Sequence, residues 1–341
     1  MTTQLSTDSG PQAGARTRTV RLPGGRTEPL KLFSARIALP VILLFFVIVF
    51  SALRPDTFAT ASNLTTVLSL QAVLTILCLG LLLPLIVGEL DLSIAGNLGL
   101  SVILVTGLTS QSGWPLVPAL VAAVGVSTLI GLVNGLLVTR IGINSFIVTI
   151  AMSALITGFI GGYTQGNVFY SNIPEGLVAL GRGDFLGVPK PVVYAALVAL
   201  LLWYLLSSTP LGRYFYAIGG SKDASRLSGV SVKNVTLLAF AGAGFLAGVA
   251  GIVQAGILGS GNPTVGSPFL LPAYAAAFLG ATAVQPGVFN VWGTVLAVIT
   301  VQVGTTGLVL LGAPFWIEPV FQGGALLIAV IAARWLKGEE I

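Results

Sequence analysis

Apolar runs, each about as long as a membrane span, alternate along the chain with short polar breaks. A helix needs about 20 apolar residues to cross the core of a bilayer, so each run predicts one transmembrane helix. Proline interrupts two of the runs, at Pro84 and at Pro268 and Pro272. The pattern therefore predicts an all-α polytopic membrane protein with about ten spans, at 37–53, 71–88, 92–109, 115–139, 145–164, 191–207, 235–257, 268–285, 291–311 and 317–334.

The break between the second and third runs is short and acidic. Residues 88–93 read Gly-Glu-Leu-Asp-Leu-Ser. Ionisable groups inside an apolar stretch are costly and are by default candidates for a functional site. We expect two helices joined through a nearly loopless translocation hinge, with Glu89, Asp91 and Ser93 as site residues. For Asp91 and Ser93 an alternative stays open, namely that one of them only caps the following helix.

Basic residues are divided unequally between the two sides that ten spans would define. If the N-terminus is cytosolic, only Arg54, Arg182 and Lys190 lie outside, which leaves 13 of the 16 Lys and Arg residues inside. Cytoplasmic segments carry such an excess, so both termini are expected in the cytosol. Residues 1–35 are polar and lack periodicity, which predicts a disordered cytosolic tail. The permease domain is expected over 36–335, with a short cytosolic tail at 336–341.

Composition narrows the class of protein further. Charged residues form 8% of the chain and hydrophobic ones 55%, against about 25% charged in a soluble domain, and the mean hydropathy is +0.97. Histidine is absent, which removes the usual general base and the commonest metal ligand. No Walker A motif is present, and the net charge of +5 is scattered over loops. We expect no catalytic residues, no metal, no cofactor and no nucleic-acid partner.

The inside loop at 208–234 contains the signals of a short helix. Ser221 suits the N-cap, Asp223 the first turn, Arg226 the last turn, and Gly229 the left-handed residue that ends it. A helix of about two turns is not stable alone in water. It therefore packs either against its own membrane ends or onto a partner protein beneath the membrane, and the sequence leaves both open.

This loop and several stretches inside the apolar runs are similar to a known family. In the loop these are Pro210-Leu211-Gly212-Arg213, Ala217-Ile218-Gly219-Gly220, Ala224 and Arg226-Leu227-Ser228-Gly229-Val230. In the runs they are Gly88 with Asp91-Leu92-Ser93, Asn134-Gly135, Phe146-Ile147-Val148-Thr149, and Leu246-Ala247-Gly248 with Ala250-Gly251. Over residues 37–335 the chain resembles the ribose-type permeases, the membrane subunits of bacterial ABC importers for monosaccharides.

The resemblance implies a type II ABC importer fold in the bacterial inner membrane, surrounded by lipid. It also implies a second permease subunit (identical or different), two ABC ATPase subunits that bind the ATP, and an extracytoplasmic sugar-binding protein. The loop would then couple to the ATPase through Gly212, Arg213, Ala217, Gly219, Gly220, Ala224, Arg226 and Gly229. Candidates for the translocation pathway are Asn134, Phe146 and Thr149, together with Gln254 and Asn262, which alternatively cap a helix.

The chain departs from the family at two places in the translocation region. Glu89 stands where the family has a second glycine, so we expect Glu89→Gly to be tolerated. Gly280-Ala281 and Gln285-Pro286-Gly287 stand where the family has glycine pairs. The identity of the sugar therefore does not carry over. The alternatives are a sugar-like signal such as autoinducer-2 as substrate, or a self-sufficient secondary transporter.

Overall fold

The computed structural model describes residues 28–337 of the chain. Most of the two tails expected at 1–35 and 336–341 lies outside this range, and α1 begins at Glu28, within the first of them. The elements are α1 (Glu28–Leu53), α2 (Ala61–Ile86), α3 (Ile94–Ser110), α4 (Leu116–Leu136), the π-helix η1 (Leu137–Ile141), α5 (Ser145–Thr164), α6 (Glu175–Gly181), β1 (Asp184–Phe185), β2 (Val188–Pro189), α7 (Lys190–Ser208), α8 (Pro210–Gly220), α9 (Lys222–Leu227), α10 (Val232–Leu258), the 3-10 helix η2 (Ser267–Phe269), α11 (Leu270–Gly280), α12 (Val291–Leu310) and α13 (Ile317–Lys337).

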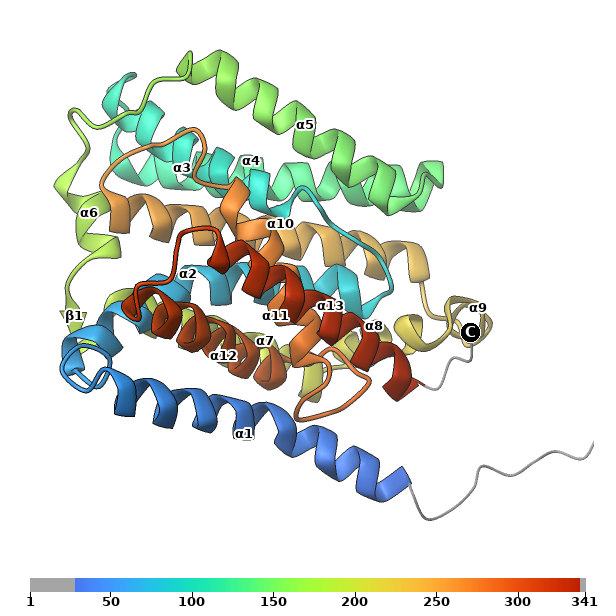
Figure 1. Ribbon diagram of the computed structural model, residues 1–341. Helices are drawn as coiled ribbons and strands as arrows, with labels where there is room; N and C mark the ends of the chain where they lie inside the picture. Colours follow the sequence, from blue (N-terminus) through green and yellow to red (C-terminus); the bar gives the residue numbers. More distant parts are fainter. Residues whose placement is uncertain (1–27, 338–341) are drawn as a thin grey trace, which may run out of the picture.

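Most of these helices lie side by side along one direction, so the bundle has two ends (Figure 1). The β1–β2 hairpin and α6 lie at one end, and α8 and α9 lie at the other. Among the described residues, seven helices are long and apolar enough to cross a membrane, and three shorter apolar helices accompany them, at Ile94–Ser110, Ser267–Gly280 and Ile317–Ala332. Each of the ten apolar runs overlaps one of these helices, and the chain is a helical multi-pass membrane protein.

Two of the predicted boundaries were wrong. The second helix begins at Ala61 rather than at residue 71, because Thr60 caps it by accepting a hydrogen bond from the Asn63 amide. The run at 268–285 is helical only as far as Gly280, and the chain then forms a loop up to Asn290, which caps α12. Local capping groups and turns, rather than hydropathy, set both boundaries.

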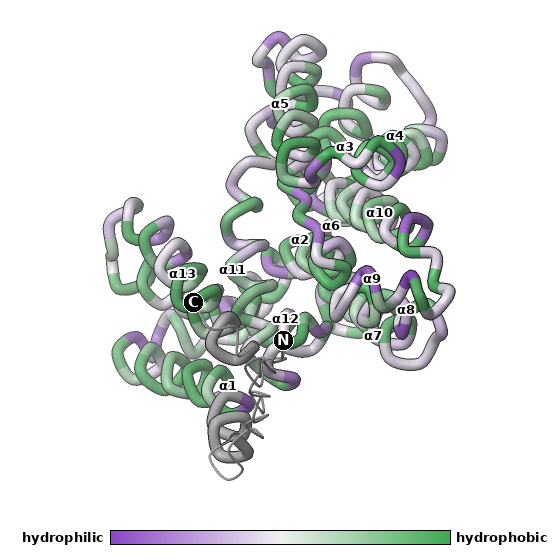
Figure 2. The backbone as a smooth tube through the Cα atoms, turned by 90° about the vertical axis from the view of Figure 1, so that its right-hand side faces the viewer, coloured by the Kyte–Doolittle hydropathy of each residue, from purple (hydrophilic) through white to green (hydrophobic). Residues whose placement is uncertain are grey.

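The most buried long helices are α2 and α10, which form the centre of the bundle. The apolar windows of these helices are 67% and 61% buried, against 11% for α1. Figure 2 looks at the bundle from the α8–α9 end, with α5 at one edge and α1 at the opposite edge. Small residues let α10 approach α4 closely, since a side chain at Gly131 would overlap the Phe240 carbonyl group.

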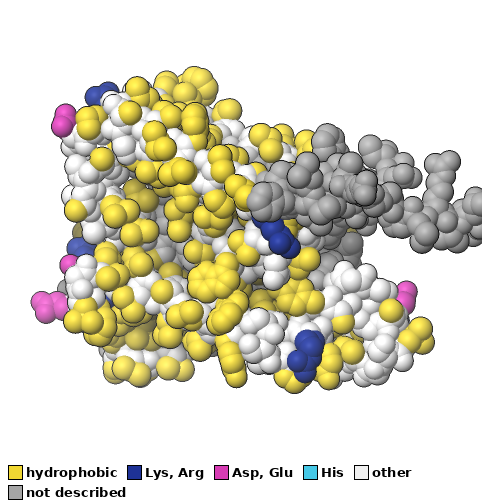
Figure 3. Space-filling model, turned by 90° about the horizontal axis from the view of Figure 1, so that it is seen from below, with side chains coloured by type: hydrophobic (Ala, Val, Ile, Leu, Met, Phe, Trp, Pro, Cys, Tyr) yellow, Lys and Arg dark blue, Asp and Glu magenta, His cyan; other side chains and the backbone are white. Residues whose placement is uncertain are grey.

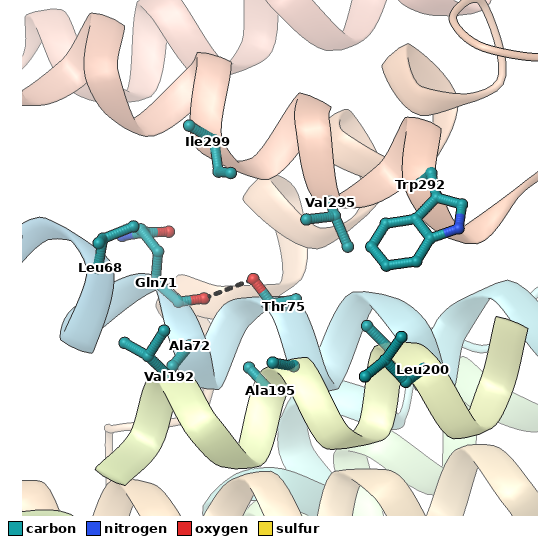
Figure 4. Close-up of a pocket in the computed structure, with 12 residues that line it drawn as sticks. Leu68, Gln71, Ala72, Thr75, Val192, Ala195, Leu200, Trp292, Val295 and Ile299 are labelled. Atoms are coloured by element: carbon teal, nitrogen blue, oxygen red, sulfur yellow. Dashed lines mark hydrogen bonds between the residues drawn. The ribbon is translucent and has the colours of Figure 1, made fainter. Parts of the chain in front are cut away.

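The outer surface carries the apolar side chains expected of a protein in contact with lipid. Hydrophobic side chains spread over the face shown in Figure 3, and the acidic side chains visible there lie at its two ends. A pocket of about 240 Å³ between α2, α7 and α12 belongs to this apolar surface (Figure 4). Besides the indole N–H of Trp292, Gln71 and Thr75 carry its only polar side-chain groups among the described residues, and Thr75 Oγ1 donates to the Gln71 carbonyl oxygen at 2.8 Å. The pocket therefore lacks the converging polar groups that a sugar would need.

The loop at 208–234 contains two helices, so the prediction of a single short one was incomplete. The predicted helix is present as α9, where Ser221 Oγ accepts from the Ala224 amide at 3.2 Å and Gly229 has a φ of +81°. The helix that the sequence analysis missed is α8, which Thr209 caps by accepting from the Gly212 amide at 3.3 Å. It buries Phe215 on the membrane domain, and this amphipathic face is the reason it forms.

Candidate functional site

The hinge at residues 88–93 interrupts the helices as predicted. Gly88 has a φ of +78°, a conformation that glycine adopts without a steric penalty, and it turns the chain at the end of α2. Residues 87–93 are not helical, and α3 begins at Ile94. Figure 1 shows this segment turning back from the α8 end toward the middle of the bundle. A non-helical backbone at this depth requires hydrogen-bond partners from the protein itself.

Side chains of two other helices supply those partners to three consecutive backbone amides. The Leu90 amide donates to Ser145 Oγ at 3.2 Å, and the Leu92 amide donates to Thr149 Oγ1 at 3.1 Å. Between them, the Asp91 amide donates to the Tyr274 hydroxyl at 3.1 Å. The hinge is therefore bonded to α5 through Ser145 and Thr149, and to α11 through Tyr274.

A second set of hydrogen bonds runs from the Asp91 carboxylate through Ser93 to α4. Asp91 Oδ1 accepts from the Ser93 hydroxyl at 2.6 Å and from the Ser93 amide at 3.0 Å. Asn134 Nδ2 donates to Ser93 Oγ at 2.8 Å, and all three side chains are at most 2% exposed. Ser93 occupies the N-cap position of α3 but its side chain makes no capping bond. The capping alternative is therefore wrong for Ser93, and Asp91 is the residue that binds a free amide at this helix start.

The charge of Asp91 has no cationic partner among the described residues, whose two ion pairs lie elsewhere. Burial of an unpaired carboxylate costs free energy, and the two hydrogen bonds from Ser93 offset part of that cost. Asn134 Oδ1 is likewise buried without a partner within the described part of the chain. The arrangement is a buried polar network that links α3, α4, α5 and α11 through the hinge.

The structure brings only some of the other pathway candidates to the hinge. Asn134 and Thr149 bind it directly, whereas Phe146 lies on α5 with 45% of its surface exposed. Gln254 is buried near the far end of α10. Asn262 Oδ1 accepts from the amide and the hydroxyl of Thr264, both at 2.9 Å, within the loop after α10. Gln254 and Asn262 thus belong to the end of the bundle opposite α8 and α9, and the hydrogen bonds of Asn262 stabilise a turn.

The predicted coupling residues on and after α8 and α9 differ in their burial and in their contacts. Gly212 is buried at the turn from α7, and Gly219 lies against the Ile86 carbonyl group at the end of α2. A third glycine, Gly229, ends the short helix α9. Apart from Gly212, all of the predicted coupling residues are exposed, namely Arg213, Ala217, Gly219, Gly220, Ala224, Arg226 and Gly229.

The exposed face also carries a large apolar residue that sequence reasoning did not single out. Leu227 is 90% exposed at the end of α9, and Tyr214 is 44% exposed on α8. An apolar side chain flanked by basic groups is typical of a surface that binds another protein. We refer to Arg213, Tyr214, Ala217, Ala224, Arg226 and Leu227 as the docking face.

Helices α8 and α9 contact the hinge segment and the end of α2 at the same end of the bundle. Glu89 Oε1 lies 2.5 Å from Lys222 Nζ at the first residue of α9. An open pocket of about 460 Å³ lies there, lined by residues from the segments 85–88, 216–220 and 285–289. The Tyr216 hydroxyl donates to the Phe289 carbonyl oxygen at 3.0 Å, and burial raises the pKa of Tyr216, which keeps the hydroxyl protonated as a donor.

A broken helix pair inside a helical membrane domain is typical of membrane transporters. Residues 63–330 match the family described as the permease component of the branched-chain amino acid transport system, and the chain belongs to this family.

Curated relatives match the chain over nearly its whole length. It is 33% identical to the ribose import permease protein RbsC of Escherichia coli over 296 residues, which cover 85% of this chain and 91% of that protein. Identity to RbsC of Bacillus subtilis is also 33%, with 86% and 92% covered. The D-allose transport system permease protein AlsC of Escherichia coli is 30% identical, with 87% and 90% covered. No solved structure matches the chain.

Proposed function

We propose that the chain is the membrane subunit of an ATP-driven, binding-protein-dependent importer for a monosaccharide in the bacterial inner membrane. It spans the membrane ten times with both termini in the cytosol, and it forms the translocation pathway without catalysing a reaction itself. The observation that carries the proposal is the docking face, which is exposed at the same end of the bundle where α8 and α9 contact the hinge. The relatives named for ribose and D-allose transport support the substrate class.

The polar network fits a neutral substrate. The Asp91 carboxylate is 2% exposed and is occupied by hydrogen bonds from Ser93, so it is not presented as a charge partner for a solute. Its role is to hold the start of α3 in place and thereby the geometry of the pathway. Relatives also include the autoinducer 2 import system permease protein LsrD of Salmonella paratyphi A, at 28% identity. A sugar-like signal is therefore the second candidate substrate.

The partners follow from the same proposal. Two ABC ATPase subunits dock on the cytosolic side and bind the ATP, so the permease needs no cofactor of its own. A soluble sugar-binding protein delivers the substrate to the outer side, and a second permease subunit, identical or different, completes the pathway within the lipid bilayer.

A substrate panel tests the proposal. The permease is reconstituted with its ATPase and its binding protein, and uptake of ribose, allose, xylose and autoinducer-2 is measured with ATP supplied to the ATPase side. We expect ATP-dependent uptake of one monosaccharide, with ATP hydrolysis stimulated by the loaded binding protein. Uptake of autoinducer-2 alone would support the second candidate. No ATP-dependent uptake of any of the four would contradict the proposal.

A further inference from the structure

The ion pair between Glu89 and Lys222 joins the segment after α2 to the start of α9. Glu89 is held to α2, because its amide donates to the Pro84 carbonyl oxygen at 2.9 Å. Lys222 is the first residue of α9 and follows the capping residue Ser221. The two residues are 133 positions apart in sequence, so the pair connects separate elements rather than neighbouring turns.

The pair is more protected than an ordinary surface ion pair. The side chain of Glu89 is 14% exposed and that of Lys222 is 43% exposed. The other ion pair on α9, Arg226 with Asp223, lies within the helix at 3.3 Å, and its side chains are 64% and 90% exposed. Solvent and salt screen an exposed pair strongly and a partly buried pair much less. The pair of Glu89 and Lys222 therefore holds its two elements together more firmly than the exposed pair could.

This pair is also the one hydrogen-bonded link between α9 and the hinge among the described side chains. The only buried residue of α9 is Ser225, while its other residues are exposed. In contrast, α8 is seated on the membrane domain by buried Phe215 and Ile218 and by close contact of Gly219 with Ile86. Movement of α9 relative to the hinge thus acts on the ion pair first.

We propose that the ion pair of Glu89 and Lys222 is a coupling link that transmits movement of the docking helix α9 to the hinge. The proposal rests on the proposed function, because it takes the ATPase as the partner that moves α9. Glu89 is two residues from Asp91, whose carboxylate binds Ser93 and through it Asn134. A displacement of Lys222 therefore moves Glu89 and, through residues 89–91 of the hinge, the buried network. Glu89 acts as a positioning residue.

The test measures coupling, which is the number of sugar molecules taken up per ATP hydrolysed by the assembled importer. In Glu89→Gln and in Lys222→Met we expect this ratio to fall by roughly two- to fivefold, as for loss of a partly exposed ion pair. Glu89→Gly should also transport, with the same lowered ratio. The double variant Glu89→Lys with Lys222→Glu restores the pair with exchanged charges and should recover the ratio. Lys233→Ala removes an exposed basic residue at the start of α10 and serves as the matched control.

A second readout reports the pair without reference to transport. A carbodiimide joins a carboxylate and an amine that are in contact, so treated permease should contain a cross-linked peptide pair holding Glu89 and Lys222, which Glu89→Gln abolishes. Sugar uptake per ATP that is unchanged in both single variants would overturn the coupling link but not the proposed function. A double variant whose ratio is no higher than that of the single variants would have the same consequence. Absence of the cross-link in the unsubstituted protein would overturn the coupling link too. If the unsubstituted complex takes up no sugar when ATP is supplied, the proposed function itself is rejected, independently of the coupling link.

Discussion

At Asp91 a single carboxylate oxygen accepts two hydrogen bonds from Ser93, and the backbone amide of Asp91 donates to Tyr274. The residue therefore fixes the chain through both its side chain and its backbone. We predict that this role depends on the acceptor more than on the charge, because the contacts of the side chain are the two hydrogen bonds that Oδ1 accepts. What matters is an acceptor at the position of Oδ1.

Two substitutions at Asp91 distinguish the effect of losing the hydrogen-bond acceptor from the effect of losing the negative charge. Asp91→Asn keeps an oxygen acceptor for Ser93 and should retain most of the ATP-driven uptake. Asp91→Leu leaves the Ser93 amide and hydroxyl buried without their acceptor, at a cost of about 1–3 kcal/mol for each group, and should abolish uptake. Uptake is measured in the assembled importer, with co-purification of the ATPase as the control for folding. Normal uptake by Asp91→Leu would show that the hinge is only a packing feature.

Tyr274 gives a test of the backbone bond. Tyr274→Phe removes the acceptor of the Asp91 amide, and an unpaired buried amide costs about 1–3 kcal/mol. The midpoint of thermal unfolding in detergent should fall accordingly. The matched control is Tyr204→Phe on α7, where the side chain is 60% exposed and no loss is expected. Equal midpoints for the two variants would mean that the hinge does not depend on this hydroxyl.

At the scale of elements, α9 was predicted from the sequence and α8 was missed. The caps of α9 are local signals, since Ser221, Asp223, Arg226 and Gly229 lie within nine residues. The glycine-rich stretch at the end of α8 obscured its amphipathic face, whose buried side consists of Gly212, Phe215 and Ile218. Its signals were nonetheless local, namely the Thr209 cap, Pro210 at the first helical position and the helical spacing of Gly212, Phe215 and Ile218, and they were overlooked.

The docking face predicts the effect of changing its exposed residues. Leu227→Asp removes an apolar anchor whose burial in an interface would contribute about 1.5–3 kcal/mol, so the affinity for the ATPase should fall about tenfold or more. Arg213→Glu and Arg226→Glu should lower uptake per ATP while the permease still inserts. Affinity is measured by titration of the ATPase onto permease in detergent. Unchanged affinity and unchanged coupling in all three variants would reject the docking face.

Gly212 acts in a different way from these exposed residues. A side chain at this position would overlap the Leu206 carbonyl group at the turn from α7. A bulky substitution should therefore distort the turn and reduce the yield of folded protein, rather than uncouple an intact complex.

At the scale of the molecule, composition and hydropathy were enough to predict the helical membrane domain, because spans follow from local apolar runs. They were also enough to single out the acidic break, because a carboxylate is rare in such a run. The partners of that break could not be predicted, since Ser145 and Tyr274 lie 55 and 183 residues from the amides that they bind. The ion pair of Glu89 with Lys222 spans 133 residues and was missed for the same reason.

The central claim is that this permease moves sugar only when a separate ATPase acts on its docking helices. The most direct test compares proteoliposomes that contain the permease alone with proteoliposomes that contain permease, ATPase and binding protein. Both are given the sugar, an imposed proton or sodium gradient, and ATP on the ATPase side. We predict ATP-dependent accumulation by the complex and none by the permease alone under either gradient. Gradient-driven accumulation by the permease alone would contradict the account and identify a secondary transporter.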